Sequence, residues 1–170
     1  FYEMTGWPDR PPAGVMGAYT DYVSPRYLAT TILAAVDHRN RTGEGQYIDL
    51  SQAESSMHFL APAVLDYKIN GELAPQIGNA HLVLCPHGAY PTLGDDKWVT
   101  IACQHQESYV RLCEVAGLSE DLKALDLASR RERASEIDEA IAKWTMTLTS
   151  KEISETLQNC GVAAHGVQVA

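Results

Sequence analysis

Apolar residues recur at helical spacing in the first quarter of the chain. Ser24 followed by Pro25 suits the N-cap and the first position of a helix, and Gly43 suits the left-handed residue that follows one. The apolar positions between them are Leu28, Ile32, Ala35 and Val36. Polar and apolar residues then alternate over 45–51, as in a strand. We therefore predict a helix from Ser24 to about Thr42 and a short strand after it.

A second helical pattern covers residues 52–69. Its apolar face carries Met57, Leu60, Ala61, Val64 and Leu65. Pro62 should kink or divide this helix, because proline has no backbone N–H to donate, and Asn70 with Gly71 should end it. Helix, strand and helix in this order are typical of part of an α/β layer.

The pattern changes character in the middle of the chain. Residues 71–88 are rich in glycine and proline, and such long connections are usually functional or cross between domains. Segments 89–92 and 97–102 have the composition of a β-hairpin. We therefore divide the chain into residues 1–70, a crossing over 71–88, and a small α+β domain over 89–170.

Helices and one strand are predicted in the rest of the small domain. The apolar positions of two helices are Tyr109, Leu112, Cys113 and Ala116, and then Ile137, Ile141, Trp144 and Leu148. Gly117 should end the first of them, and Thr149 with Glu152 forms a capping box that begins a third helix. A last strand is predicted over 162–169.

Charge excludes one class of partner. The formal net charge is −9, whereas proteins that bind nucleic acid gather lysine and arginine against the phosphates. The densest basic cluster, Arg130, Arg131 and Arg133, is interleaved with Glu132 and Glu136, which indicates a solvated helix face. An apolar share of 45% is ordinary for a globular protein. We therefore expect that nucleic acid is not a partner.

The spacing of the cysteines indicates the cellular compartment, and the two ends of the chain indicate whether it is part of a larger protein. Cys85, Cys103, Cys113 and Cys160 form neither CxxC nor a metal-ligand pattern, so we expect free thiols in a reducing cytoplasm and no metal site. No apolar run has the roughly 20 residues of a membrane span. The chain begins at Phe1 in an apolar stretch and stops at 167–170 in a strand-like one, so we expect an internal piece of a larger protein.

Asp21 is the first candidate for chemistry. It precedes the predicted cap Ser24 by three residues, so its carboxylate should lie near the positive end of a helix. That setting suits an ionised and exposed nucleophile. An aspartate in an ordinary turn would satisfy the same local sequence, and residues alone leave both interpretations open.

Several segments together resemble one family. His38-Arg39-x-x-Thr42-Gly43-x-Gly45-Gln46, an apolar strand and Ser51-Gln52-Ala53-Glu54 resemble the hallmark stretch of the class III (CaiB/BaiF-type) CoA-transferases. Further similar segments, in the family's order, are 5–12 (TG-x-P-x-x-PP), 78–79 (GN), 86–90 (PHG-x-Y) and 161–164 (GVPA). Ala163 stands where proline is usual. The family includes formyl-CoA and carnitine CoA-transferases and, as a side branch, the α-methylacyl-CoA racemases.

The resemblance implies a fold, a reaction and partners. The fold would be α/β, with part of a Rossmann-like large domain followed by a small α+β domain, in an interlocked homodimer. Asp21 stands at the position of the family's catalytic carboxylate, which passes through a mixed anhydride and an aspartyl-CoA thioester. The substrates would be an acyl-CoA and a carboxylic acid, with coenzyme A as substrate and no other cofactor. The groups that bind CoA would lie mainly upstream of residue 1. Asp37 and Asp49 stand elsewhere in the motif.

The loop after Gly78 supplies the remaining candidates, Asn79, His81 and His87, as substrate-binding residues. Formyl-CoA transferase carries a run of glycines here, whereas this chain has none, so a different acid is expected. Loop histidines with ordinary hydrogen bonds are the simpler alternative, and Cys85 is expected to be a buried thiol.

Two other functions stay open. In an acyl-CoA racemase, Asp21 would act as an acid/base at the α-carbon. The chain could also be a non-catalytic fragment that folds without turnover.

Overall fold

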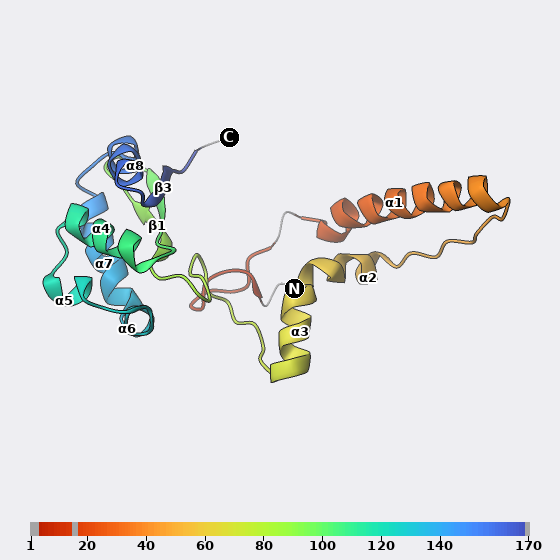
Figure 1. Cartoon of the computed structure of the whole chain (residues 1–170), viewed down its shortest axis with the longest axis horizontal. Coiled ribbons are helices and arrows are strands. Elements are labelled where there is room, and N and C mark those ends of the chain that lie inside the picture. Colours follow the sequence, from red (N-terminus) through yellow and green to blue (C-terminus); the bar gives the residue numbers. More distant parts are fainter. Residues whose placement is uncertain (1–3, 15–16, 169–170) are drawn as a thin grey trace. The chain divides into compact units, whose positions relative to one another are not determined.

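The computed structural model describes residues 4–14 and 17–168, and the chain divides into two compact units, residues 1–78 and 79–170 (Figure 1). We call them the first and the second unit. Their boundary falls inside the connection over 71–88 that the sequence indicated.

The first unit begins with helix α1, Tyr19–Thr42. The predicted start at Ser24 is wrong, because the helix begins five residues earlier and Pro25 lies inside it. Ser24 does not act as a cap, since its hydroxyl is buried against residues of the next helix. Pro25 has no N–H, so the helical hydrogen bond to the carbonyl of Asp21 cannot form. The end at Thr42 is confirmed, with Gly43 in the left-handed region at φ 80° and its N–H 2.8 Å from the Arg39 carbonyl.

The strand predicted over 45–51 is wrong. No helix or strand is assigned between Gly43 and Ser51 among the residues that the structure describes, and the Tyr47 side chain is 92% exposed. A strand needs a neighbour for its backbone groups, and alternation of side chains does not provide one.

The division of the second helical segment is confirmed. It consists of α2 (Gln52–Met57), a 3-10 turn η2 (His58–Leu60) and α3 (Ala61–Asn70). Pro62 lies in the first turn of α3, where a missing N–H costs nothing, and Gly71 ends the helix.

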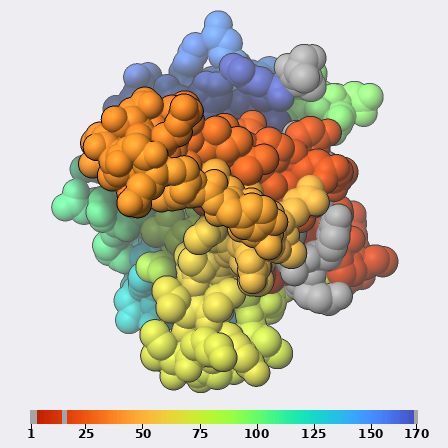
Figure 2. Space-filling model, turned by 90° about the vertical axis from the view of Figure 1, so that its right-hand side faces the viewer, coloured from red at the N-terminus to blue at the C-terminus, as the bar shows by residue number. Residues whose placement is uncertain are grey.

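Small and polar residues hold the first unit together. Val23, Ser24, Ser55 and Ser56 are its buried residues among those described, and they lie where α1 meets α2. Large apolar residues of the unit are exposed instead: Leu28, Ile32, Leu33, Val36, Met57, Phe59, Leu65 and Ile69. Figure 2 looks onto the surface that α1, in orange, and α2 and α3, in yellow, present.

The second unit is built on an antiparallel sheet in the order β1-β2-β3. The predicted hairpin is confirmed as β1 (His87–Pro91) and β2 (Trp98–Ala102), with Tyr90 opposite Val99. The last strand, β3 (Ala163–Gly166), is shorter than predicted, and residues 169–170 of that prediction lie outside the described residues.

Helices pack against this sheet. The predicted helices are α4 (Gln106–Ala116), α7 (Ala134–Thr145) and α8 (Ser150–Asn159). Gly117 ends α4, and the capping box of Thr149 and Glu152 begins α8, both as predicted. The sequence analysis missed α5 (Glu120–Lys123) and α6 (Leu127–Glu132), which are too short to show a period. No described helix has both the length and the apolar character of a membrane span.

The hydrophobic core belongs to the second unit. Its fully buried side chains include Val99, Ile101, Tyr109, Leu112, Ile137, Ile141, Ile153, Leu157 and Val162. All four cysteines are free thiols, and Cys85 is buried as predicted. Burial raises the pKa of the Cys103 thiol to about 12, so it stays protonated at neutral pH.

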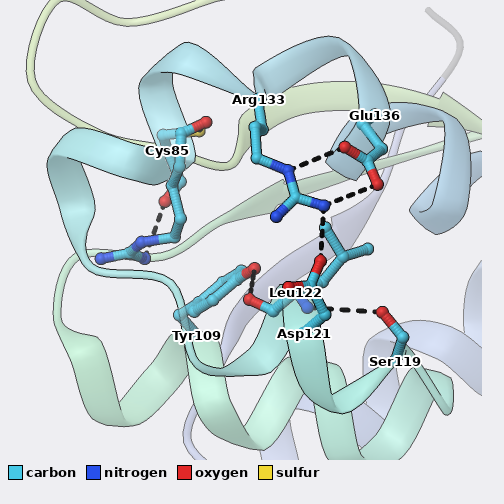
Figure 3. A network of polar contacts seen from close by, with 8 residues as sticks. Cys85, Tyr109, Ser119, Asp121, Leu122, Arg133 and Glu136 are labelled. Atoms are coloured by element: carbon cyan, nitrogen blue, oxygen red, sulfur yellow. Dashed lines mark hydrogen bonds and ion pairs between the residues drawn. The ribbon is translucent and has the colours of Figure 1, made fainter.

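Arg130 is buried in this unit, so the prediction of a solvated arginine cluster is wrong at this position. It is 3% exposed, and its guanidinium lies 4.3 Å from the centre of the Tyr109 ring. Nη1 donates to the Cys85 carbonyl at 2.8 Å and Nη2 to Gln106 Oε1 at 3.0 Å. Figure 3 labels Cys85 and Tyr109 from this surrounding and shows Arg133 paired with Asp121 and Glu136. Arg130 thus joins the loop before β1 to α4 and α6.

The α8 capping box should make the stability of the second unit depend on pH. The Thr149 hydroxyl and N–H, 2.7 and 2.9 Å from Glu152 Oε2, lower the pKa of Glu152 in the folded state. This stabilisation is present above the unfolded pKa and is lost as pH falls through the folded one. We expect Glu152→Gln to lower the urea midpoint at pH 7 and to have no effect near pH 3. Glu139→Gln, an exposed change on α7, is the control, and an equal effect of Glu152→Gln at both pH values would contradict the prediction.

Candidate functional site

Asp21 lies in the first turn of α1 and is exposed. Its N–H donates to the Ala18 carbonyl at 3.0 Å, and its side-chain Oδ1 accepts a hydrogen bond from Gln52 Nε2. The sequence analysis expected Asp21 just before the helix, whereas it lies inside the first turn. The positive end of the helix dipole in that turn is a favourable place for a carboxylate. The second oxygen, Oδ2, accepts no hydrogen bond from any residue that the structure describes.

Buried hydroxyls fix the residue that holds Asp21. The backbone carbonyl of Gln52 lies 3.1 Å from both Ser24 Oγ and Ser55 Oγ and 2.8 Å from Ser56 Oγ. The Ser24 and Ser55 hydroxyls also lie 2.9 Å from each other. Each hydroxyl has one hydrogen, so one of these two donates to the carbonyl while the other donates to its neighbour. This arrangement fastens the start of α2 to the first turns of α1.

Two open hollows flank this turn. One, with a volume of about 380 Å³, is lined by Asp21, Ser24, Pro25, Leu28, Leu50 and Gln52. The other, of about 500 Å³, lies between residues 17–20 and α2 and is lined mainly by apolar groups. Asp21 and Gln52 therefore present polar atoms at the surface of a concave and otherwise largely apolar region, the usual character of a small-molecule site.

The other aspartates of the motif are less suited to chemistry. Asp37 forms an ion pair with Arg41 at 2.9 Å, one turn before the end of α1. Asp49 lies exposed in the extended segment after α1. Among the residues that the structure describes, no group of three or more histidine, cysteine or carboxylate side chains could hold a metal ion.

The loop candidates Asn79, His81 and His87 gather at the start of the second unit. The rings of His81 and His87 lie 5.2 Å apart, and His87 Nδ1 lies 2.8 Å from the Asn79 carbonyl. Because a carbonyl only accepts, His87 Nδ1 carries a hydrogen. His81 Nδ1 instead accepts from the N–H groups of residues 83 and 84 at 3.0 and 3.1 Å, so a neutral His81 carries its hydrogen on Nε2. The structure brings these three residues together within one unit and Asp21 with Gln52 within the other.

Gln52 is the site residue that the sequence analysis missed. It lies 31 positions from Asp21, and although it belongs to the segment 51–54 quoted for the family resemblance, nothing in the sequence indicated its contact with Asp21.

Comparisons with known proteins all indicate CoA-transferases. The family model "CoA-transferase family III" matches residues 1–170. The chain is 28% identical to a succinyl-CoA–D-citramalate CoA-transferase of Chloroflexus aurantiacus, covering 98% of this chain and 42% of that protein. It is 35% identical to a succinyl-CoA:mesaconate CoA-transferase of Haloarcula hispanica, covering 92% of this chain and 39% of that protein.

Solved structures agree with the fold. A CaiB/BaiF family protein from Brucella suis matches with a TM-score of 0.84 and 25% identity, covering 99% of this chain and 45% of that one. The chain thus spans less than half the length of each of these relatives.

Proposed function

This chain belongs to CoA-transferase family III, and from that membership we propose that the whole protein moves CoA from an acyl-CoA donor to a carboxylic acid, with Asp21 as the covalent carrier. The observation that carries the proposal is the setting of Asp21. It is an exposed carboxylate in the first turn of a helix, at the edge of an open hollow, with one oxygen held by Gln52.

The first half-reaction loads Asp21. Oδ2 attacks the carbonyl carbon of the donor thioester, and collapse of the tetrahedral intermediate expels the CoA thiolate and leaves a mixed anhydride. The thiolate then attacks Asp21 Cγ, and the donor leaves as a free carboxylate. Asp21 is now an aspartyl-CoA thioester.

The second half-reaction transfers CoA from Asp21 to the acceptor acid. A carboxylate oxygen of the acceptor attacks Asp21 Cγ and expels the CoA thiolate, which gives a second anhydride. The thiolate attacks the acceptor's carbonyl carbon, so the new acyl-CoA forms and the Asp21 carboxylate is restored. Each step exchanges one acyl bond for another, so the cycle consumes no cofactor.

The substrates that we propose are succinyl-CoA and a second dicarboxylic acid. The two relatives above are named for succinyl-CoA with citramalate or mesaconate, both of which are dicarboxylic acids. We also propose that Asn79, His81 and His87 contact the substrate acid in a cytoplasmic homodimer. A hydrogen on His81 Nε2 makes that ring a hydrogen-bond donor of the kind a carboxylate accepts, while the Nδ1–H of His87 ties that ring to the Asn79 carbonyl beside it.

An exchange experiment tests the reaction class. We expect the whole protein, given unlabelled succinyl-CoA and ¹³C-succinate, to transfer the label into succinyl-CoA, because the Asp21 cycle runs in both directions. Mass spectrometry of the CoA esters measures the transfer. Absence of exchange with succinate and with mesaconate would contradict the proposal.

A second incubation separates the transferase from a racemase. The protein is incubated with a 2-methylacyl-CoA in D₂O without any acceptor acid. A transferase leaves the α-hydrogen in place, whereas an acid/base at the α-carbon replaces it with deuterium. Deuterium incorporation under these conditions would overturn the transferase proposal.

A further inference from the structure

We propose that Gln52 is a second catalytic residue, whose side-chain N–H stabilises the oxyanion that forms on Asp21 Oδ1 each time Asp21 Cγ is attacked. The inference rests on the proposed function, because it needs Asp21 to carry the acyl and CoA groups. It assigns a chemical step to a residue that lies 31 positions away in the sequence.

The geometry supplies the donor in the right place. Gln52 Nε2 already donates to Oδ1 of the free carboxylate. After acylation of Oδ2, or after CoA has replaced it, Oδ1 is the carbonyl oxygen of the Asp21 group. A nucleophile that adds to Cγ turns that carbonyl oxygen into an oxyanion, and the N–H that touched it before then stabilises the new charge.

The support of Gln52 keeps this donor in position. A glutamine side chain loses rotamer freedom when it is fixed, so an effective donor needs a rigid base. Here the backbone carbonyl of Gln52 accepts from the hydroxyl of Ser56 and from that of either Ser24 or Ser55, which are bonded to each other, and the three serines are only 5%, 7% and 2% exposed. Ser24 belongs to α1, the same helix as Asp21, so donor and nucleophile are fixed to one another.

The same hydrogen bond also distinguishes the two oxygens of Asp21. Oδ1 is engaged by Gln52, so Oδ2 is the oxygen free to attack the donor thioester. The oxyanion of that first attack forms on the donor's own oxygen, which Gln52 does not hold. Gln52 therefore acts on the two steps at Asp21 Cγ, formation of aspartyl-CoA and its attack by the acceptor.

Kinetics of Gln52→Ala test this division of steps. Loss of one oxyanion donor lowers kcat by about 10²–10³-fold, and we expect this loss without a matching rise in the KM for the acyl-CoA. Rapid quench and mass spectrometry of the Asp21 peptide should show slower gain of the CoA mass in a single turnover. Gln104→Ala, the same change at an exposed position of the second unit, is the control.

A second variant gives a readout that a structural role would not produce. Gln52→Glu keeps the size of the side chain but places a carboxylate beside Asp21, so at pH 8 it should be less active than Gln52→Ala. Once protonated, the new carboxyl group donates an O–H to Oδ1, and like charges at this distance raise its pKa. The activity of Gln52→Glu relative to Gln52→Ala should therefore rise as pH is lowered from 8 to 5.5.

The outcomes separate this inference from the proposed function. Wild-type protein that never shows a CoA mass on the Asp21 peptide would overturn the proposed function. A wild-type protein that shows it, together with a Gln52→Ala variant of unchanged kcat, would overturn the inference alone. A pH-independent ratio between Gln52→Glu and Gln52→Ala would overturn it as well.

Discussion

Asp21→Asn should abolish CoA exchange in the whole protein, with kcat reduced by at least about 10⁴-fold, the scale on which loss of a covalent nucleophile acts. The amide has the size of the carboxylate and still offers Oδ1 to Gln52, so the surrounding contacts remain. It cannot attack a thioester, because its nitrogen lone pair is delocalised and its oxygen is uncharged. Initial rates of acyl exchange, followed by chromatography of the CoA esters, measure the effect.

Asp37→Asn is the matched control for this variant. It makes the same chemical change in the same helix, but at a carboxylate that is exposed and paired with Arg41. Surface ion pairs contribute little, so this variant should fold and retain its activity. If Asp21→Asn were as active as Asp37→Asn, another residue would have to carry the acyl group.

Arg130→Ala should lower the stability of the second unit by about 3 kcal/mol. The change leaves the buried Cys85 carbonyl without its donor, which costs about 1–3 kcal/mol, and it removes the contact with the Tyr109 ring and most of a buried side chain. Part of this loss is offset, because a buried cation with uncharged partners is itself costly to desolvate. Hydrogen exchange of peptides from α4 and β2 reports the free energy of opening.

Two further variants locate the cause of that loss. Arg131→Ala removes a neighbouring exposed arginine and should change the opening free energy by less than about 0.5 kcal/mol. Arg130→Met keeps much of the volume and removes the charge, so it should lie between wild type and Arg130→Ala. Equal effects of Arg130→Ala and Arg131→Ala would contradict the assignment of Arg130 as a buried link.

Local sequence predicted the elements whose signals are local. Gly43 and Gly71 end their helices because glycine adopts left-handed backbone angles without strain. The capping box begins α8 because Thr149 and Glu152 each accept a hydrogen bond from the backbone N–H of the other. The start of α1 was wrong because Ser24, a plausible cap, bonds instead with Ser55, 31 positions away. The strand at 45–51 was wrong because pairing depends on a neighbour that a pattern of side chains does not contain.

The candidate site likewise combines a residue with a local sequence signal and residues defined by distant contacts. Asp21 could be proposed from the sequence because the segments around it resemble those of the family to which the chain belongs. Gln52 lies in the same family-like stretch, but its contact with Asp21 could not be predicted, nor could the burial of Arg130, since each depends on residues far away in the sequence. The alternating charges of this segment predicted a solvent-exposed helix face. The structure shows that one arginine of the cluster, Arg130, packs against the Tyr109 ring instead.

Pro25 changes the backbone hydrogen bonding of α1. A helix resists bending through its ladder of hydrogen bonds, and here the bond to the Asp21 carbonyl is absent by chemistry. The turn that carries Asp21 thus lacks one bond of that ladder, and the buried hydroxyl of Ser24 ties the neighbouring turn to α2 instead. The position of Asp21 therefore depends on contacts between the two helices as well as on the helix that carries it.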